Sequence, residues 1–232
     1  MIEQIIQWDK ELLITLNGSS SLFLDGIFMA ITQTTTWIPL FVCLLYAVIK
    51  NNHWRNALLI ILMVALLVLL CDRFASGFCK PYFHRLRPSR EPDLAEMIDL
   101  VNGYRSGLYG FISSHASNTF GLSVFFSLLF RSKKVTPLLL LYACLSSYSR
   151  MYLGVHYPLD ILMGTLWGIL CGMAVYAFYR WLNRKLFPSA STFTPSYTAT
   201  GYKRSDLYPI LGVFPVTFIY IIIRGVLFTA SS

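Results

Sequence analysis

Three short segments of the sequence place cationic and imidazole side chains at spacings that suit phosphate chemistry. They run from Lys80 to Pro88, from Ser113 to His115, and from Ser149 to Asp160. Hydrolysis of a phosphate ester requires positive charge near the non-bridging oxygens, an in-line nucleophile, and a proton for the departing alkoxide. Together the segments contain side chains that can serve each of these needs, so they form one candidate catalytic site.

The cations of these segments are the candidates for holding the phosphate group. Lys80, Arg87 and Arg150 can supply the charge, and an arginine offers a two-pronged hydrogen-bonding fork to phosphate oxygens. Ser113 and Ser114 come immediately before an apolar segment, where helix N-cap residues are found. Free backbone N–H groups at such a helix start can also bind an anion. We therefore expect phosphate to bind at these residues.

His156 is the candidate nucleophile. Pro158 suits the first turn of a helix, which leaves His156 just before the helix and places Asp160 one turn inside it. Asp160 can then bond one imidazole nitrogen, fix the tautomer, and leave the other nitrogen free to attack phosphorus. His115 has no carboxylate near it in sequence, so we expect it to donate a proton to the leaving group.

Each of these side chains also has a purely structural interpretation. A cation at a helix end can snorkel to the membrane interface, Asp160 can complement a helix dipole, and a serine can simply cap a helix. His84 is assigned to this structural class, and Trp8, Tyr104 and Tyr109 are interpreted as interface anchors. Convergence of all three segments on one membrane face favours the catalytic interpretation.

The composition predicts an integral membrane protein. Hydrophobic residues make up 56% of the 232 residues and charged residues 13%, against about 25% charged in an average soluble domain. A helix needs about 20 residues to cross the hydrocarbon layer. Six apolar segments can supply crossings: Trp37 to Ile49 (long enough if its helix begins near Leu22), Ala57 to Leu70, Ala116 to Phe130, Pro137 to Ser147, Pro158 to Leu182, and Leu207 to Phe228. We therefore predict an all-α bundle of six transmembrane helices forming a single domain over residues 1–232.

The two ends of the chain carry further predictions. Acidic residues near the N-terminus, and the lack of a positive start before an apolar core, argue against a cleavable signal. Apolar side chains recur there at roughly helical spacing, which predicts an amphipathic helix in the membrane interface. These side chains are Ile5, Ile6, Trp8, Leu12, Leu13 and Leu16. Towards the other end, the Ser/Thr-rich stretch from Ser189 to Tyr202 is predicted to be a cytoplasmic linker.

The positions of lysine and arginine predict the orientation. Three alternate loops carry basic residues, and the positive-inside rule places these loops in the cytoplasm. Both termini and all three motif segments then lie on the opposite face, which is the periplasmic face if the membrane is a bacterial inner membrane. Arg73, Arg85, Arg90 and Arg105 lie on this face outside the motif positions. We expect them to contact head-group charge or to snorkel.

The three segments resemble the motifs of the type 2 phosphatidic acid phosphatase superfamily. Lys80 to Pro88 matches its Lys, six residues, Arg-Pro motif, and Ser149 to Asp160 matches its Ser-Arg, five, His, three, Asp motif. The middle motif, Pro-Ser-Gly-His in many members, is Ile112-Ser113-Ser114-His115 here. Ile112 thus replaces a proline that shapes a loop and does no chemistry. The resemblance covers Asp72 to Gly164, with the motifs in order.

The resemblance implies a metal-independent phosphatase of six-helix architecture, with no cofactor. It implies that His156 forms a phosphohistidine, that Asp160 orients it, and that His115 is the general acid. The implied phosphate-binding residues are Lys80, Arg87, Ser113, Ser114 and Arg150. The spacing of the five cysteines suits no metal site either. Vanadium haloperoxidases share this site but are soluble, so the apolar segments favour the lipid phosphatases.

The expected substrate is a phosphorylated lipid of the bilayer. Undecaprenyl pyrophosphate, lipid A phosphate and phosphatidylglycerol phosphate are the candidates for an outward-facing site. A lipid phosphotransferase, in which another alcohol takes the phosphate from the histidine, is the alternative enzyme. An anion transporter fits less well, because transporters show internal repeats and interrupted helices near mid-membrane. Nucleic acid is not an expected partner, because the basic residues are divided between two membrane faces.

Overall fold

The computed structural model describes residues 1–94, 96–186 and 195–231, and their regular structure is helical. Two isolated β-bridges, Leu86 to Tyr109 and Tyr197 to Lys203, are the sheet-like pairings within these residues. The α-helices are α1 (Ile2–Leu16), α2 (Leu22–Thr32), α3 (Ile38–Asn51), α4 (Trp54–Asp72), α5 (Lys80–Phe83), α6 (Ser114–Phe130), α7 (Val135–Tyr152), α8 (Pro158–Leu186) and α9 (Tyr208–Ser231). A π-helical segment, Arg73–Cys79, joins α4 to α5, and short 3-10 helices lie at Thr34–Trp37, Pro88–Arg90, Pro92–Leu94, Val101–Gly103 and Arg204–Leu207.

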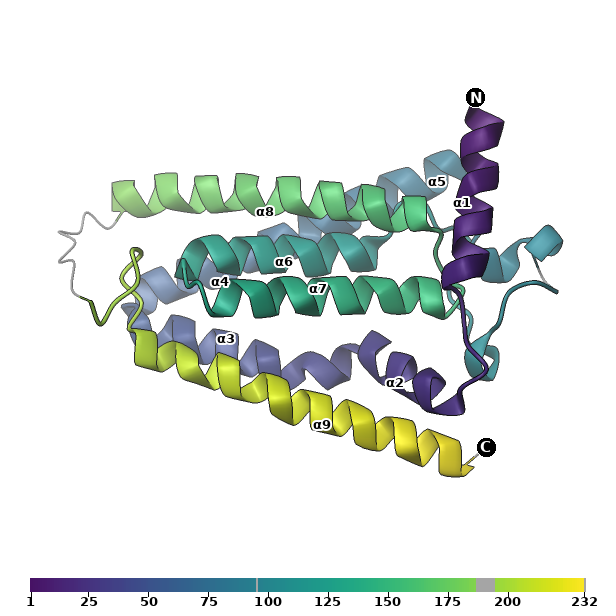
Figure 1. Ribbon diagram of the computed structural model, residues 1–232. Helices are drawn as coiled ribbons and strands as arrows, with labels where there is room; N and C mark the ends of the chain where they lie inside the picture. Colours follow the sequence, from purple (N-terminus) through teal and green to yellow (C-terminus); the bar gives the residue numbers. More distant parts are fainter. Residues whose placement is uncertain (95, 187–194, 232) are drawn as a thin grey trace.

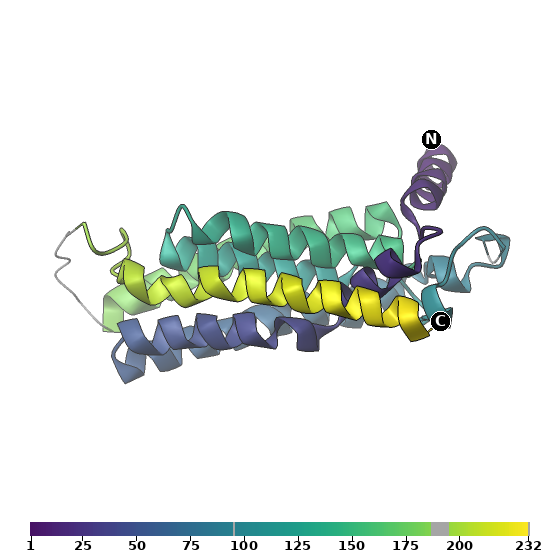
Figure 2. The same ribbon diagram turned by 60° about the horizontal axis from the view of Figure 1, so that its bottom comes forward.

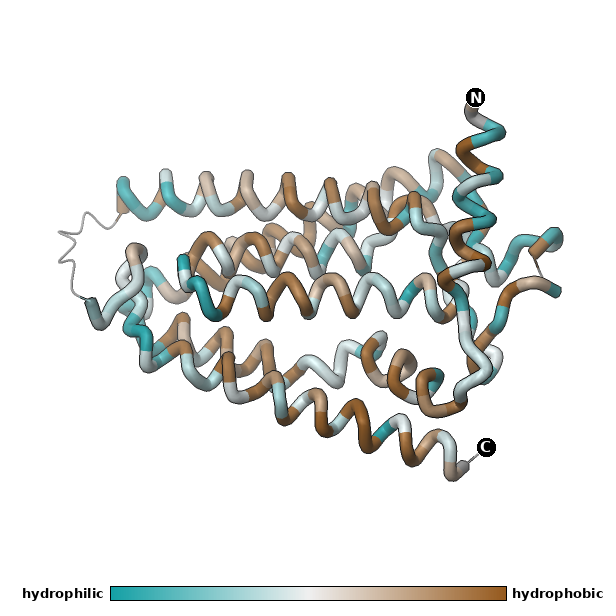
Figure 3. The backbone as a smooth tube through the Cα atoms, viewed as in Figure 1, coloured by the Kyte–Doolittle hydropathy of each residue, from teal (hydrophilic) through white to brown (hydrophobic). Residues whose placement is uncertain are grey.

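The long helices lie side by side along one direction, and α1 lies across one end of them (Figures 1 and 2). Both chain termini lie at this same end, together with α5 and the connection from α5 to α6. Hydropathy follows the arrangement, since apolar residues line the lengths of the helices while hydrophilic residues gather at the two ends and on α1 (Figure 3). The described residues therefore form a bundle with two polar ends and an apolar middle.

The centre of the bundle is α6, which packs against α4, α7 and α8. Phe125 and Phe130 of α6 are fully buried, and so are Leu67 of α4 and Leu139 of α7 to within 1% exposure. Large apolar side chains also face outward, among them Leu166 and Leu170 of α8, Val216 and Ile219 of α9, and Leu62 of α4. A helix that is apolar on its outer face as well as its inner face is typical of a membrane bundle.

Glycines allow α6 and α8 to approach closely. Gly164, Gly168 and Gly172 follow one another at intervals of four residues, so they share one face of α8. A β-carbon at Gly168 would meet the backbone carbonyl of Ser117, and one at Gly164 would meet the carbonyl of Ser113. Small residues at four-residue spacing permit this kind of backbone contact between membrane helices. The close approach brings the start of α6 beside the start of α8.

Four helical segments of the described residues are long and apolar enough to cross a membrane: Thr34–Asn51, Trp54–Phe83, Pro158–Leu186 and Arg204–Ala230. They coincide with four of the six predicted crossings. The other two predicted crossings fall on α6 and α7, which lie lengthwise in the bundle (Figure 1). Much of α6 is buried, including polar residues such as Ser117 and Thr119, so a large share of it contacts protein instead of the surroundings of the bundle.

The crossing predicted from near Leu22 to Ile49 is not one continuous helix. The α-helix α2 ends at Thr32, Gln33 adopts an extended conformation, and a 3-10 turn leads into α3. Backbone carbonyls at the end of α2 lack the N–H partners that a continuing helix would supply, and side chains bind them. Thr36 Oγ1 donates to Ala30 O at 2.6 Å, and Trp37 Nε1 donates to Ile31 O at 2.9 Å. These bonds satisfy backbone groups that would be costly to leave unpaired.

The described part of the predicted linker packs against the bundle. Residues 189–194 of the stretch from Ser189 to Tyr202 lie outside the described residues. The remainder turns back on itself, since Thr198 N donates to Tyr202 O at 2.8 Å. Tyr202 is 3% exposed and its hydroxyl accepts a hydrogen bond from Asn52 at 3.0 Å. A buried tyrosine tied to the end of α3 makes this turn part of the packed bundle.

Candidate active site

The three predicted motif segments meet at the end of the bundle where the termini lie (Figure 1). The first segment forms α5 and the chain that follows it, the second starts α6, and the third links α7 to α8. Ser113 N donates to the Asp160 carbonyl at 3.0 Å, which joins the second segment to the third. Arg87 contacts His156, which joins the first segment to the third. Segments that are up to 80 residues apart therefore share one site.

His156 and Asp160 form a buried pair. The imidazole Nδ1 lies 3.2 Å from Asp160 Oδ2, and their residues are 1% and 0% exposed. The same carboxylate oxygen accepts the backbone N–H of Tyr157 at 3.1 Å, as an N-terminal helix residue does. Donation from Nδ1 to the carboxylate leaves Nε2 with its lone pair. The contact expected from the spacing is present, and it gives His156 the tautomer that a nucleophile needs.

Arg87 lies against Nε2 of His156, the nitrogen expected to attack phosphorus. Its Nη1 is 2.8 Å from His156 Nε2 and donates to the Val155 carbonyl at 2.9 Å. Its Nε donates to the Tyr109 carbonyl at 3.1 Å. These bonds fix a guanidinium that is only 5% exposed. A phosphoryl group at Nε2 would therefore have its oxygens beside a fixed donor fork.

Lys80 contacts the second segment. Its Nζ donates to Ser114 Oγ at 3.0 Å and to Ser76 Oγ at 2.9 Å. Ser76 and Lys80 are four residues apart on a helical stretch, so they lie on one face. Ser76 had no place in the sequence prediction, although this spacing was a signal for it. The lysine ammonium group and the two serine hydroxyls thus form a hydrogen-bonded cluster at the start of α6.

The start of α6 carries the other predicted serine and the second histidine. Ser113 is the N-cap residue, and its hydroxyl accepts the Ala116 N–H at 3.3 Å. The prediction of an N-cap at this position is confirmed. His115 Nε2 lies 2.8 Å from Ser146 Oγ of α7. Ser146 was not predicted, and no sequence spacing relates it to His115.

Arg150 reaches two side chains that the sequence did not connect with the site. Its Nη1 donates to Thr32 Oγ1 at 2.6 Å and to the Tyr104 hydroxyl at 3.1 Å. Its Nε is buried and has no hydrogen-bond partner among the described residues. Tyr104, which the sequence predicts to be an interface anchor, thus also contacts an arginine of the third motif. Thr32 contributes because α2 ends beside α7 and exposes its last residues to that helix.

The three motif cations act electrostatically on His156. Burial lowers the pKa of His156 well below its usual value of 6.5, and the positive charges of Arg87, Arg150 and Lys80 lower it further. The imidazole is therefore neutral at neutral pH. Burial and the nearby Arg150 lower the pKa of Arg87 to about 10, which leaves the guanidinium charged under the same conditions. A neutral nucleophile surrounded by cations is the charge arrangement that attack on a phosphate anion requires.

Arg85 was expected to contact head-group charge or to snorkel, but its guanidinium instead binds two carboxylates of the protein. Its Nη1 donates to Asp160 Oδ1 at 3.1 Å, and its Nη2 donates to Asp9 Oδ2 at 2.6 Å. The guanidinium also stacks over the Tyr157 ring at 4.0 Å. The physical reason is the position of α1 across the site end of the bundle, which brings the buried carboxylate of Asp9 within reach of this arginine. Asp9, like Ser76, Ser146 and Thr32, is a residue that the sequence prediction missed.

Three further residues from the sequence analysis, His84, Arg90 and Ile112, make local contacts near the site. His84 ends α5 in a left-handed conformation, and its ring packs edge-on against Tyr109 at 4.9 Å. Arg90 Nη2 donates to the Ser106 carbonyl at 3.3 Å. Ile112, which replaces the motif proline, is 3% exposed and packs in one cluster with Ala75 and Cys79. The isoleucine therefore fills an apolar position between the first and second segments.

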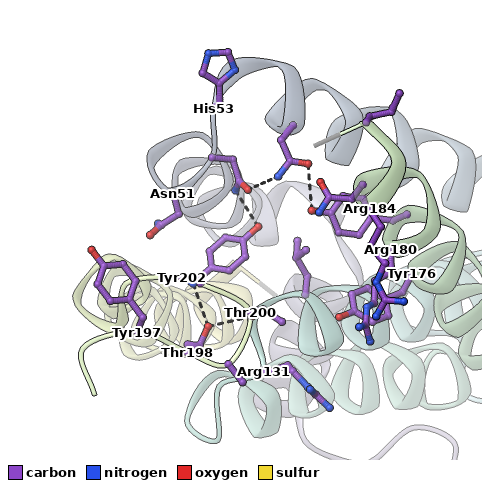
Figure 4. A pocket seen from close by; sticks show the side chains of 18 of the residues that line it. Asn51, His53, Arg131, Tyr176, Arg180, Arg184, Tyr197, Thr198, Thr200 and Tyr202 are labelled. Atoms are coloured by element: carbon purple, nitrogen blue, oxygen red, sulfur yellow. Dashed lines mark hydrogen bonds between the residues drawn. The ribbon is translucent and has the colours of Figure 1, made fainter. Parts of the chain in front are cut away.

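A polar cavity of about 830 Å³ lies at the opposite end of the bundle (Figure 4). Its lining includes four arginines: Arg55, Arg131, Arg180 and Arg184. They belong to the helix ends and loops that the basic-residue pattern assigned to one membrane face. The candidate catalytic residues do not line this cavity, so the candidate active site rests on the contacts between the motif segments.

The family comparison matches the stretch of chain that builds this site. The model of the PAP2 superfamily, the type 2 phosphatidic acid phosphatases, matches residues 56–184, a range that contains all three motifs. The chain belongs to the PAP2 superfamily. The resemblance drawn from the motifs is thereby confirmed, and this PAP2 protein is a phosphatase.

Individual relatives extend the likeness over the whole chain. A "Lipid A 4'-phosphatase" of Bacteroides thetaiotaomicron is 36% identical over 222 residues, which cover 95% of this chain and 97% of the relative. A protein of the same name from Porphyromonas gingivalis is 36% identical over 86% of this chain and 85% of its own length. The crystal structure of Aquifex aeolicus LpxE superposes with a TM-score of 0.52 at 25% identity, covering 72% of this chain and 93% of that one. These likenesses place the PAP2 protein in the membrane lipid phosphatase branch.

Proposed function

We propose that this phosphatase hydrolyses a phosphate monoester on the head group of a lipid A-type glycolipid and releases inorganic phosphate. The observation that carries the substrate class is the similarity to two lipid A 4'-phosphatases over 95% and 86% of the chain. The similarity therefore extends well beyond the three motif segments.

The proposed reaction proceeds through a phosphohistidine. His156 Nε2 attacks phosphorus while the P–O bond to the sugar breaks, and His115 gives the departing alkoxide its proton. Asp160 holds the Nδ1 proton and stabilises the positive charge that forms on the ring. Water then attacks phosphorus while the P–N bond to His156 breaks and His115 takes a proton from the water, so inorganic phosphate leaves and neutral His156 is regenerated. The 3.2 Å contact from Nδ1 to Asp160 supports this assignment.

The cationic residues are proposed to hold the transferring phosphoryl group. Lys80 and Arg87 of the first segment and Arg150 of the third carry positive charge near the histidine, and the N-cap of α6 adds backbone N–H groups. Ser113 and Ser114 belong to this helix start, and Ser114 already contacts Lys80. Because these groups can neutralise the developing charge, the proposed mechanism uses neither a metal ion nor another cofactor.

The membrane arrangement is proposed to comprise six crossings. Four crossings are the long apolar segments, and α6 and α7, which run alongside them, are the other two. Several polar residues of α6 are buried in the bundle. Both termini lie at the site end, which is consistent with an even number of crossings, and we propose that this end faces the periplasm because the basic loops lie at the other end. The exposed apolar side chains of α1, including Ile5, Trp8 and Leu12, suit contact with that interface.

Phosphate release from a lipid panel tests the proposal. Purified protein in chelator-treated detergent micelles would be given lipid A bearing phosphates at both sugar ends, undecaprenyl pyrophosphate and phosphatidylglycerol phosphate. We expect release from lipid A with loss of the 4'-phosphate, read by mass spectrometry, and no release by His156→Ala. Release confined to one of the other lipids would contradict the substrate class. Activity that a chelator abolishes would contradict the metal-independent mechanism.

A further inference from the structure

The N-terminal helix α1 is fixed to the active-site end by three different contacts. Leu13 is 0% exposed and packs with Leu94, Ile98 and Tyr157, and Tyr157 follows His156 in the chain. Lys10 Nζ lies 3.9 Å from Glu91 and 3.7 Å from Asp93. Asp9 lies deeper than Lys10 and is 7% exposed. The apolar side chains on its other face remain exposed, so α1 contacts the site on one face only.

Asp9 uses both carboxylate oxygens at the start of α8. Its Oδ1 accepts the backbone N–H of Leu159 at 2.8 Å, and its Oδ2 accepts Arg85 Nη2 at 2.6 Å. Leu159 directly precedes Asp160 in the chain. The carboxylate therefore holds both the backbone next to Asp160 and the arginine that contacts its side chain.

Arg85 carries the connection from Asp9 to the catalytic pair. One arm of its guanidinium bonds Asp9, and the other donates to Asp160 Oδ1 at 3.1 Å. Asp160 uses its second oxygen for Tyr157 N–H and for His156 Nδ1. A planar guanidinium can hold two carboxylates in a fixed relation, which a flexible ammonium group cannot do as well. The Tyr157 ring under the guanidinium restricts it further.

We infer that Asp9 is a positioning residue for the reaction, acting through Arg85 to hold Asp160 in the orientation that aligns His156. The inference rests on the proposed function, because it assigns Asp9 to the step in which His156 attacks phosphorus. An anchor for α1 alone would not need this geometry, since Leu13 and Lys10 already attach the helix. Asp9 differs from them because its contacts end on the carboxylate that bonds the nucleophile.

Charge also argues for this role. Arg85 would otherwise place an unbalanced positive charge beside Asp160 and draw the carboxylate away from His156. A second carboxylate on the far arm balances the guanidinium, so Asp160 remains available to the imidazole. Outer hydrogen-bond partners are known to fix the orientation of metal-binding histidines, and the same geometry is available here to a histidine that binds no metal.

Steady-state kinetics of four variants test the inference: Asp9→Asn, Arg85→Gln, the two combined, and Lys10→Gln as the matched control. For Asp9→Asn we expect kcat to fall about tenfold, the lower end of what losing an outer partner of a functional histidine costs, with little change in KM. Lys10→Gln alters the neighbouring residue of the same helix and should keep kcat. The double variant should be no slower than Arg85→Gln alone, because residues that act through one another are not additive.

Arg85→Lys is a second, milder variant that keeps the charge and removes the fork. We expect its kcat to fall as in Asp9→Asn while its melting temperature stays near that of Lys10→Gln. Wild-type kcat in Asp9→Asn, a change confined to KM, or additive losses in the double variant would overturn the inference while the proposed function stands. A wild-type protein that releases phosphate from no lipid would overturn the proposed function itself, and the inference with it.

Discussion

At the scale of single residues, the site depends on keeping one imidazole neutral among three cations. His156 is 1% exposed, and both its burial and its cationic neighbours lower its pKa. Spacing in the sequence was enough to pair His156 with Asp160, because a proline at a helix start fixes the geometry of the few residues around it. Spacing could not reveal Asp9, Thr32 or Ser146, because each contacts the site from a different helix.

The lowered pKa of His156 predicts a pH-dependent contribution to stability. The folded protein keeps His156 neutral, whereas the unfolded chain protonates it below about pH 6.5. The unfolded state then binds more protons, so this contribution is present above that pH and is lost as the pH falls, by up to about 1.4 kcal/mol per pH unit. When the pH is lowered from 7.5 to 5.5, we expect the melting temperature of the wild type to fall more than that of His156→Gln. An identical difference at both pH values would contradict the lowered pKa.

Arg87 predicts a loss that does not depend on the lipid. Its guanidinium contacts His156 Nε2, so it should stabilise the phosphoryl group in the transition state of every substrate. Arg87→Ala should raise the barrier by roughly 3 kcal/mol, about a hundredfold in rate. Arg180→Ala removes an equal charge from the cavity at the other end of the bundle and is the control. Similar losses of kcat in the two variants would show that Arg87 acts only through overall charge.

At the scale of elements, close contact between α6 and α8 sets the distance between the second and third motifs. Apolar runs in the sequence predicted where most helices lie, because a long apolar segment has few alternatives in a membrane. They could not predict the break after Thr32, where side chains of Thr36 and Trp37 replace backbone hydrogen bonds. Nor could they show that the turn ending at Tyr202 packs against α3, since this depends on one buried ring.

The glycine contact predicts the effect of a single methyl group. Gly168→Ala would place its β-carbon against the Ser117 carbonyl and push α6 from α8. Overpacking of this kind costs about 1–3 kcal/mol, and the shift should also lower kcat because Ser113 and Asp160 are bonded across the same contact. Gly212→Ala, where a β-carbon meets nothing within 4 Å, is the matched control. Equal melting temperatures and activities for the two variants would refute this role of the contact.

At the scale of the whole molecule, the two polar ends of the bundle carry different sets of residues. One end carries the three motif segments and both termini, and the other carries the arginine-lined cavity. The pattern of basic loops predicted this division from the sequence. Single cysteines at positions 90 and 133, on a background without the five native cysteines, test the orientation. We expect an impermeant reagent to label position 90 in intact cells and to leave 133 unlabelled; the reverse would contradict the orientation.

The central claim is that the phosphoryl group of a lipid is transferred to His156 before water releases it. Rapid mixing of the protein with lipid A labelled in its 4'-phosphate, followed by an alkaline quench that preserves phosphohistidine, measures this directly. We expect label on His156 in the wild type, none in His156→Ala, and slower appearance in His115→Ala because the leaving group lacks its acid. Phosphate release by wild type with no labelled histidine, or full release by His156→Ala, would contradict the account.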